Sequence, residues 1–161
     1  MKYTNRCVVA LLAIVLCCLG AGCGERTKLL SLVGYNHTEH GIGGYVVRLA
    51  DGSWDEAGYL GPGEGGGSMM GSVSVPMRWQ PGMTVTVIMY TVKDGQDIHV
   101  VKVVPVPRYA AAHANYFVVH FLHDGSYKVL VTRVLLGHRE YPLSGKEAEL
   151  VPGEPLEIVW E

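Results

Sequence analysis

The sequence predicts an all-β fold, an antiparallel β-sandwich or open barrel built from Asp-Gly hairpins, after an N-terminal leader. Short stretches rich in β-branched residues alternate with three Asp-Gly pairs, which begin at Asp51, Asp94 and Asp124. Asp-Gly tolerates the positive φ of a tight hairpin turn. No stretch after residue 28 sustains a helical period, although 110–114 and 146–150 could each form one helical turn. Regularly spaced short strands and turns are typical of sandwiches and barrels.

The clearest single element is a predicted hairpin over residues 83–106. With Asp94 and Gly95 as its two turn residues, four pairs follow: Thr91 with Ile98, Met89 with Val100, Val87 with Lys102, and Val85 with Val104. Strand alternation then gives the core face Met83, Val85, Val87, Met89, Val100, Val104 and Val106. The opposite face carries Thr84, Thr86, Ile88, Tyr90, His99, Val101 and Val103. A slip of one residue would mix the two faces, so the register is well specified.

The first 22 residues are predicted to be a cleaved signal peptide. Lys2 and Arg6 precede an unbroken apolar run over residues 7–19, and small residues follow it. The run is shorter than the roughly 20 apolar residues that a membrane-spanning helix needs. All four cysteines lie in this stretch or directly after it, at positions 7, 17, 18 and 23.

Cys23, at the predicted cleavage junction, is interpreted as the acyl acceptor of a bacterial lipoprotein. Secreted domains normally pair their cysteines or lack them, and no cysteine follows Cys23. The preceding Leu19-Gly-Ala-Gly resembles a lipobox, except that Gly20 stands where an aliphatic residue is usual. Gly24, in place of Asp, favours delivery to the periplasmic face of the outer membrane. Ordinary cleavage near Gly22, which would release a soluble periplasmic protein, is the alternative.

Residues 23–28 are predicted to be a short tether, and 29–161 a single β-domain. The expected strands cover residues 29–33, 45–50, 53–60, 68–75, 83–92, 97–106, 116–122 and 127–134. Two glycine-rich connections, 34–44 and 61–67, separate the early strands, and the second is expected to be mobile. The tail after Pro152 could add one edge strand.

The charge balance argues against nucleic acid as a partner. Lys2 and Arg6 belong to the leader, which leaves eleven basic against fifteen acidic residues in the mature chain. A mildly acidic chain without a basic cluster lacks the electrostatic footprint of nucleic-acid binding. Membrane attachment is therefore expected from the lipid anchor and not from a polybasic face.

No motif in the sequence predicts catalysis or cofactor binding. Residues 61–66 match the dinucleotide pattern G-x-G-x-x-G, but no helix is expected after them to hold a pyrophosphate. The seven histidines include two loose pairs, His37 with His40 and His120 with His123. A metal site needs three or four converging ligands, so histidines bonded to backbone are the preferred interpretation. Serine-nucleophile motifs are missing too. We therefore expect no enzyme, no metal and no cofactor.

Aromatic and arginine side chains outside the expected strand cores are the candidates for partner binding. They are Trp54, Tyr59, Trp79, Arg108 and Tyr109. Such residues anchor protein interfaces because they bury a large area at modest entropic cost. A tryptophan near a turn can instead cap the end of a sandwich core, which is the commoner role at any single position.

Several segments resemble a known family. They are 31–38 (SLVGYNHT), 65–68 (GGGS), 75–87 (VPMRWQPGMTVTV), 104–107 (VPVP), 119–125 (VHFLHDG) and 137–142 (GHREYP). They are similar to the small proteobacterial lipoproteins of domain-of-unknown-function family 3304. A cysteine pair is frequent in that family shortly after the glycine loop, where this chain has Met70-Gly71. The family offers no assigned catalytic residue.

The resemblance implies a function through genomic context. Members often lie beside genes for type VI secretion lipase effectors, and some lipoproteins in such positions are immunity proteins that bind the toxic phospholipase in the periplasm. We therefore expect a lipid-anchored binding protein that neutralises a phospholipase effector, with loops 34–44 and 61–70 entering its active-site cleft. The alternative is a structural or accessory envelope lipoprotein without an effector partner.

Overall fold

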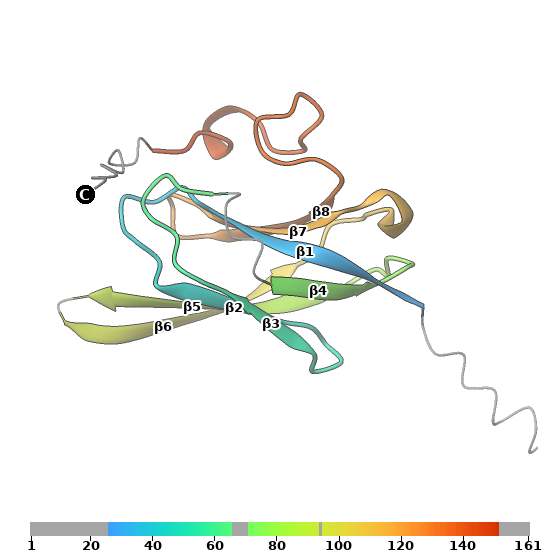
Figure 1. Ribbon diagram of the computed structural model, residues 1–161, viewed down its shortest axis with the longest axis horizontal. Coiled ribbons are helices and arrows are strands. Elements are labelled where there is room, and N and C mark those ends of the chain that lie inside the picture. Colours follow the sequence, from blue (N-terminus) through green and yellow to red (C-terminus); the bar gives the residue numbers. More distant parts are fainter. Residues whose placement is uncertain (1–25, 66–70, 94, 152–161) are drawn as a thin grey trace, which may run out of the picture.

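The protein is a β-sandwich in the computed structural model, which describes residues 26–65, 71–93 and 95–151 (Figure 1). One sheet, the β1 sheet, has the strand order β4-β1-β7-β8, and the other, the β5 sheet, has the order β3-β2-β5-β6. The strands are β1 (Thr27–Asn36), β2 (Gly44–Arg48), β3 (Trp54–Ala57), β4 (Gly71–Pro76), β5 (Thr84–Lys93), β6 (Gln96–Pro105), β7 (Tyr116–Phe121) and β8 (Tyr127–Thr132). Two separate sheets make a sandwich, as predicted, and not a closed barrel.

Asp51-Gly52 and Asp124-Gly125 form the expected hairpin turns, and Gly95 lies in the turn between the paired residues Lys93 and Gln96. These turns connect β2 with β3, β5 with β6, and β7 with β8, and each of these pairs of strands is antiparallel. Gly52, Gly95 and Gly125 have φ of 85°, 76° and 76°, a region that glycine reaches without steric penalty. In the first and third turns the aspartate carboxylate also accepts a hydrogen bond from the amide two residues on.

The register of β5 and β6 is the predicted one in all four pairs. On the predicted core face, four valines are buried and two methionines pack against the core: Val85, Val87, Val104 and Val106, with Met83 and Met89. On the opposite face, Val101 is 59% exposed and Val103 is 68% exposed. The alternation of the sequence therefore predicted correctly which side of this hairpin faces the other sheet.

One pairing departs from an all-antiparallel arrangement. β1 runs parallel to β7, with Ser31 opposite Tyr116 and Asn36 opposite Phe121. Parallel neighbours need a crossover connection, and here the strands β2 to β6 lie between them in the chain. The pairing places the residues that follow β1 next to the end of β7.

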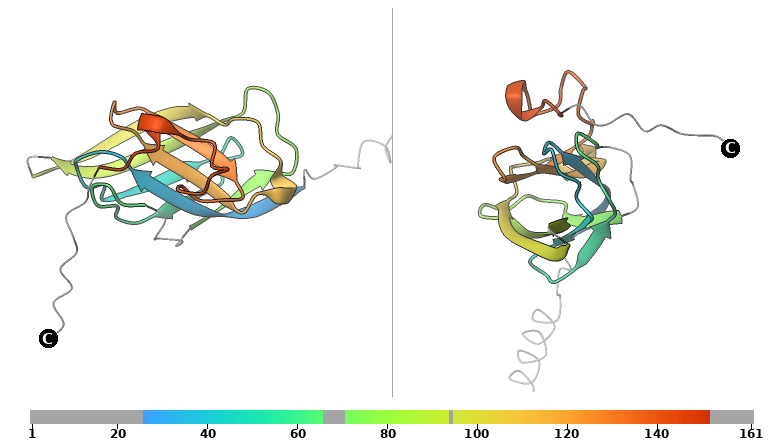
Figure 2. Two further views of the ribbon diagram at one scale, coloured as in Figure 1. Left: turned by 90° about the horizontal axis from the view of Figure 1, so that it is seen from above. Right: turned by 90° about the vertical axis from the view of Figure 1, so that its left-hand side faces the viewer.

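The C-terminal segment, residues 133–150, adds a third layer over the outer face of the β1 sheet (Figure 2). Tyr141 and Leu143 of this segment form a second apolar cluster with Val33, Tyr35 and Val118 of the sheet. The centre of the β1 sheet is thus buried on both faces, which explains its continuous apolar runs. The two expected helical turns appear as single 3-10 turns, Ala111–His113 and Gly145–Glu147.

The sandwich has two ends that differ in what they carry. We call the end where β1 begins the N-terminal end; β4 and β6 finish there and β5 and β7 start there (Figure 1). The opposite, distal end holds the β5–β6 and β7–β8 turns and the connections that follow β1 and β3.

Some predictions fall on residues that the structure does not describe. The leader 1–22, Cys23 and the edge strand expected after Pro152 lie outside the described residues. In the part of the chain that is described, no helix is long and apolar enough to cross a membrane.

Candidate functional site

Asn36, the last residue of β1, organises the loops of the distal end. Its side chain is fully buried. The Nδ2 group donates to the carbonyl oxygens of His40 at 2.7 Å, Leu60 at 3.3 Å and Gly61 at 3.0 Å. Its Oδ1 accepts from the amide and the hydroxyl of Thr38 at 3.0 and 2.7 Å. One side-chain amide therefore fixes both glycine-rich connections, because it bonds to backbone in each.

The second glycine-rich connection lies against β1. The amide of Asn36 donates to the Glu64 carbonyl at 2.8 Å, and the Glu64 carboxylate accepts from the Gly61 amide at 2.6 Å. A Cβ on Gly65 would lie 2.0 Å from the Tyr35 ring, so only glycine lets the backbone approach that ring so closely. Residues 61–65 are therefore hydrogen-bonded and packed against the end of β1, whereas residues 66–70 lie outside the described residues.

A cleft of about 820 Å³ opens at the distal end, between the 38–42 loop and the tips of two hairpins. Apolar side chains from both sheets line most of it: Ile42, Met89, Val92, Val100, Phe121, Leu122 and Tyr127. Thr38, Glu39, His40 and His123 supply polar groups. An apolar cleft with few polar groups suits an apolar side chain of a partner, or an acyl chain, better than a charged small molecule.

Tyr59 stands beside this cleft. Its side chain is 62% exposed, and a Cβ on Gly41 would lie 2.8 Å from its hydroxyl, so the ring packs directly on the loop backbone. From the other side the Thr91 hydroxyl donates to the Gly41 carbonyl at 3.0 Å. The loop is therefore held by β1, by β5 and by an exposed aromatic ring.

The other four residues predicted for partner binding lie at the N-terminal end. Trp54 begins β3 and is 59% exposed, and Arg108 is exposed after β6. Trp79 and Tyr109 donate from Nε1 and the hydroxyl to backbone carbonyls of the facing segment, at 2.8 and 2.9 Å. Trp79 and Tyr109 thus fasten loops together at the end of the sandwich. Only Tyr59, of the five, lies near the distal loops.

Two buried histidines and a tyrosine form a hydrogen-bonded chain beneath the C-terminal segment. His37 Nδ1 lies 2.9 Å from the Glu149 carbonyl oxygen. His37 Nε2 lies 2.8 Å from His120 Nδ1, and His120 Nε2 lies 2.7 Å from the Tyr141 hydroxyl. The ring of Tyr35 stacks on His120, with centroids 5.2 Å apart. Both histidines are fully buried.

The Glu149 carbonyl at one end of this row of hydrogen bonds determines which ring nitrogen carries the proton in each histidine. A carbonyl oxygen only accepts, so the neutral His37 ring carries its hydrogen on Nδ1 and accepts at Nε2. His120 then donates from Nδ1 and accepts from Tyr141 at Nε2. Burial is the largest cause that lowers the pKa of both rings, and with the neighbouring His37 it lowers the pKa of His120 to about 3. Both rings are therefore neutral near pH 7 and hold the segment by hydrogen bonds.

The pairing of these histidines differs from the pairs that their sequence positions suggest. His37 meets His120, whereas His40 and His123 are exposed. The parallel register of β1 and β7 is the cause, since it joins residues that are distant in sequence. Across residues 26–65, 71–93 and 95–151, no three His, Cys, Asp or Glu side chains are grouped so that they could hold a metal ion.

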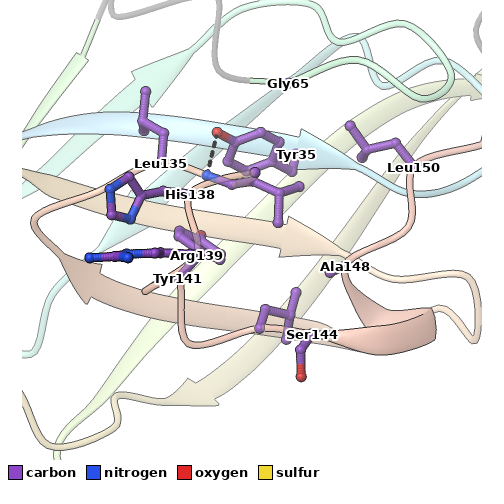
Figure 3. Close-up of a pocket in the computed structure, with 12 residues that line it drawn as sticks. Tyr35, Gly65, Leu135, His138, Arg139, Tyr141, Ser144, Ala148 and Leu150 are labelled. Atoms are coloured by element: carbon purple, nitrogen blue, oxygen red, sulfur yellow. Dashed lines mark hydrogen bonds between the residues drawn. The ribbon is translucent and has the colours of Figure 1, made fainter.

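A second hollow, of about 830 Å³, lies between the C-terminal segment and the β1 sheet (Figure 3). Figure 3 shows the Tyr35 hydroxyl accepting a hydrogen bond from the amide of Leu136, at 3.1 Å. His138 Nδ1 accepts from the amide of Glu140 at 3.2 Å. Because these polar groups already serve to hold the segment, we interpret the hollow as a packing feature of the third layer.

Comparison with known proteins adds one family. The family model described as "Protein of unknown function (DUF3304)" matches residues 35–129, which is more than half of the chain. Neither the curated proteins nor the solved structures contain a match. The matched range includes the distal loops, the cleft and His120, and it stops before the C-terminal segment.

Proposed function

The chain belongs to the DUF3304 family, and from that premise we propose that it is a lipid-anchored periplasmic binding protein. Its role in this proposal is immunity: it neutralises a phospholipase effector of type VI secretion by covering the effector's active site. The observation that supports a binding role best is the apolar cleft at the distal end, bordered by loops that hydrogen bonds hold in place.

The position of this cleft suits a lipid-anchored binder. β1 and β5 have ten residues each, so the two ends of the sandwich lie about 30 Å apart at roughly 3.3 Å per residue. An acyl group on Cys23 would keep the N-terminal end at the outer membrane. The distal end would then face the periplasm, where it can meet an effector.

The distal surface has the features of a protein interface. Tyr59 provides an exposed aromatic anchor, and the cleft beside it can accept an apolar side chain. The loop that borders the cleft is already fixed by Asn36 and Thr91, so binding orders little additional backbone. Less ordering means a smaller entropic cost of association.

Inhibition by such a surface needs no chemistry from the chain. A phospholipase must place its active site against lipid, so a protein seated over the mouth of that site excludes the substrate. The proposed protein is accordingly a stoichiometric inhibitor and not an enzyme.

The test is a binding and activity assay with the mature chain from residue 24, which keeps every described strand. The partner is the lipase encoded beside its gene, and hydrolysis of a soluble short-chain phospholipid is followed in the same sample. We expect stoichiometric loss of hydrolysis. Tyr59→Ala should weaken binding about tenfold or more, as for an interface anchor.

Trp54→Ala is the matched control, because it removes an equally exposed aromatic ring at the opposite end. Inhibition should be unchanged by it. Binding without inhibition would indicate an adaptor or chaperone for the effector. Absence of binding would overturn the immunity role and favour an accessory envelope lipoprotein.

A further inference from the structure

Two loops at the N-terminal end are joined into one rigid surface. Arg78 of the β4–β5 connection forms a β-bridge with Ala110, which lies after β6. The indole of Trp79 and the hydroxyl of Tyr109 donate across the same junction, to the carbonyls of Val106 and Pro76. The side chains that these loops carry outward are therefore held in place without a partner protein.

Apolar side chains are also exposed toward this end of the sandwich. Met77 is 37% exposed, Trp54 is 59% exposed and Leu29, near the start of β1, is 66% exposed. Leu29 lies near the start of β1, Met77 follows the last residue of β4, and Trp54 begins β3, so all three lie toward the N-terminal end of the sandwich. Large apolar side chains scattered among basic residues are typical of surfaces that contact the headgroup region of a bilayer.

Charge is divided between the two ends. The N-terminal end carries five basic residues, Arg26, Lys28, Arg48, Arg78 and Arg108, and the ion pair of Arg133 with Glu140, against the acidic Asp51, Asp55 and Glu56. The distal end carries the acidic residues Glu39, Glu64, Asp97, Asp124 and Glu147 against the basic Lys93, Lys102 and Lys128. In the described part of the chain, Arg48, Arg78 and Arg108 form no ion pair. These basic residues come from separate positions in the sequence, and the fold brings them to the same end of the sandwich.

The length of chain between Cys23 and β1 limits how far this end can move from an anchor. β1 begins at Thr27, four positions after Cys23. Four residues span at most about 14 Å, which is comparable with the screening length of about 8–10 Å near physiological salt. A folded partner protein does not fit into that gap, whereas the bilayer surface fills it.

We propose that the N-terminal end of the sandwich is a docking surface for an anionic lipid bilayer, built around Trp54, Met77, Arg78 and Arg108. The inference rests on the acylation of Cys23 in the proposed function, and it reassigns Trp54 and Arg108 from partner binding to membrane contact. Arg78 and Arg108 bind lipid phosphates, and Trp54 and Met77 enter the headgroup region. The contact keeps the long axis of the sandwich upright and the distal cleft away from the membrane.

The experiment reproduces the anchor chemically. Cys23 is the only cysteine of the mature chain, so the mature chain that begins at Cys23 can be coupled through it to a maleimide lipid in vesicles. A Trp160→Phe background leaves Trp54 and Trp79 as the fluorescent reporters. The vesicles contain brominated lipids, which quench tryptophan fluorescence on contact. They are made of phosphatidylcholine alone or of phosphatidylcholine with roughly 30% of the anionic lipid phosphatidylglycerol.

We expect quenching in the anionic vesicles that falls with added salt. The double variant Arg78→Gln with Arg108→Gln should reduce the docked fraction, with about a tenfold or larger change in the docking equilibrium, since each basic residue near an anionic surface contributes appreciably. The control variant Lys128→Gln with Lys146→Gln removes the same charge from the other part of the molecule. It should leave quenching unchanged.

Absence of quenching, or equal effects of the arginine and lysine variants, would overturn the docking surface. Circular dichroism of each variant confirms that its strands remain folded. Because the coupling does not depend on cellular acylation or on a lipase, this result is independent of the inhibition assay. Docking without lipase inhibition would refute only the proposed function, and inhibition without docking would refute only the inference.

Discussion

The two ends of the sandwich use the same residue types for different purposes. At the distal end a buried amide, Asn36, holds glycine-rich loops around an apolar cleft, and acidic residues outnumber basic ones. At the N-terminal end, the half-buried Trp79 and Tyr109 tie the loops together, and basic residues outnumber acidic ones. An exposed aromatic residue or arginine therefore indicates a contact surface but not its partner, which depends on the end of the fold where it lies.

The largest expected effect on stability comes from removing the Asn36 side chain, which holds the loops of the distal end. Asn36→Ala removes the five hydrogen bonds of this buried side chain, so the Leu60 and Gly61 carbonyls keep only the backbone amides of Ile42 and Glu64 as donors. We expect the free energy of unfolding to fall by about 3 kcal/mol, since each lost hydrogen bond contributes a net of about 0.5–1.5 kcal/mol. Urea unfolding measures this loss, and lipase binding should fall with it.

Asn115→Ala is the matched control for that variant. Its Nδ2 group makes one exposed hydrogen bond, to the Arg133 carbonyl at 3.4 Å. The expected loss is below about 1 kcal/mol. Equal losses for the two asparagines would contradict the organising role of Asn36.

The histidine chain should make stability depend on pH. The folded-state pKa of His120 is lowered to about 3 and that of His37 is also lowered, so below about pH 6.5 the unfolded chain binds more protons than the folded one. The stabilisation is complete at pH 7 and is lost as pH falls. From His120 alone we expect a loss of about 2 kcal/mol between pH 7 and pH 5.

Urea unfolding at a series of pH values measures this slope. Tyr35, Tyr141, His123 and Lys128 also face or influence these rings. The comparison variant is therefore His120→Gln, which removes one titrating group and leaves the others. Its slope should be shallower, and an unchanged slope would show that other groups carry the dependence.

A smaller effect on stability, this time a gain, is expected from a substitution at Tyr45 in the core between the two ends. Tyr45 is fully buried and, among the described residues, its hydroxyl is the buried side-chain polar atom without a hydrogen-bond partner. Tyr45→Phe removes that group and keeps the edge-to-face contact with Phe121. We expect a gain of about 1 kcal/mol in thermal or urea unfolding, and a loss would mean that the hydroxyl has a partner such as water.

The smallest effect on stability should come from the N-terminal end. Arg78→Gln with Arg108→Gln changes exposed side chains only, so unfolding should shift by no more than about 0.5 kcal/mol. Bilayer docking should nevertheless be lost. A large loss of stability would mean that these arginines support the loops themselves.

Local patterns predicted local structure well. Asp94-Gly95 and the alternation of valines specify the β5–β6 register without help from the rest of the chain, and all four predicted pairs are present. The parallel pair of β1 and β7 has no such signal, because nothing near either strand encodes its partner. The histidine chain, which depends on that pair, was therefore missed.

The role of Asn36 was also hidden in the sequence. An asparagine before a glycine-rich stretch is normally part of a turn. Asn36 joins two loops only because the fold places residues 60–61 next to its side chain. Tyr141 was passed over because it follows the last expected strand, in a segment without a clear period. In both cases the signal exists only in three dimensions.

The parallel pairing has a consequence for how the chain folds. Ser31 pairs with Tyr116, which lies eighty-five positions later, so β1 can pair with β7 only after most of the chain has been made. The β5–β6 hairpin, closed by a two-residue turn, can form at once. Since contacts between distant residues slow folding, we expect the β5 sheet to act as the template on which β1 and β7 later assemble. A chain that emerges N-terminus first would therefore expose the apolar faces of β1 until its second half has arrived.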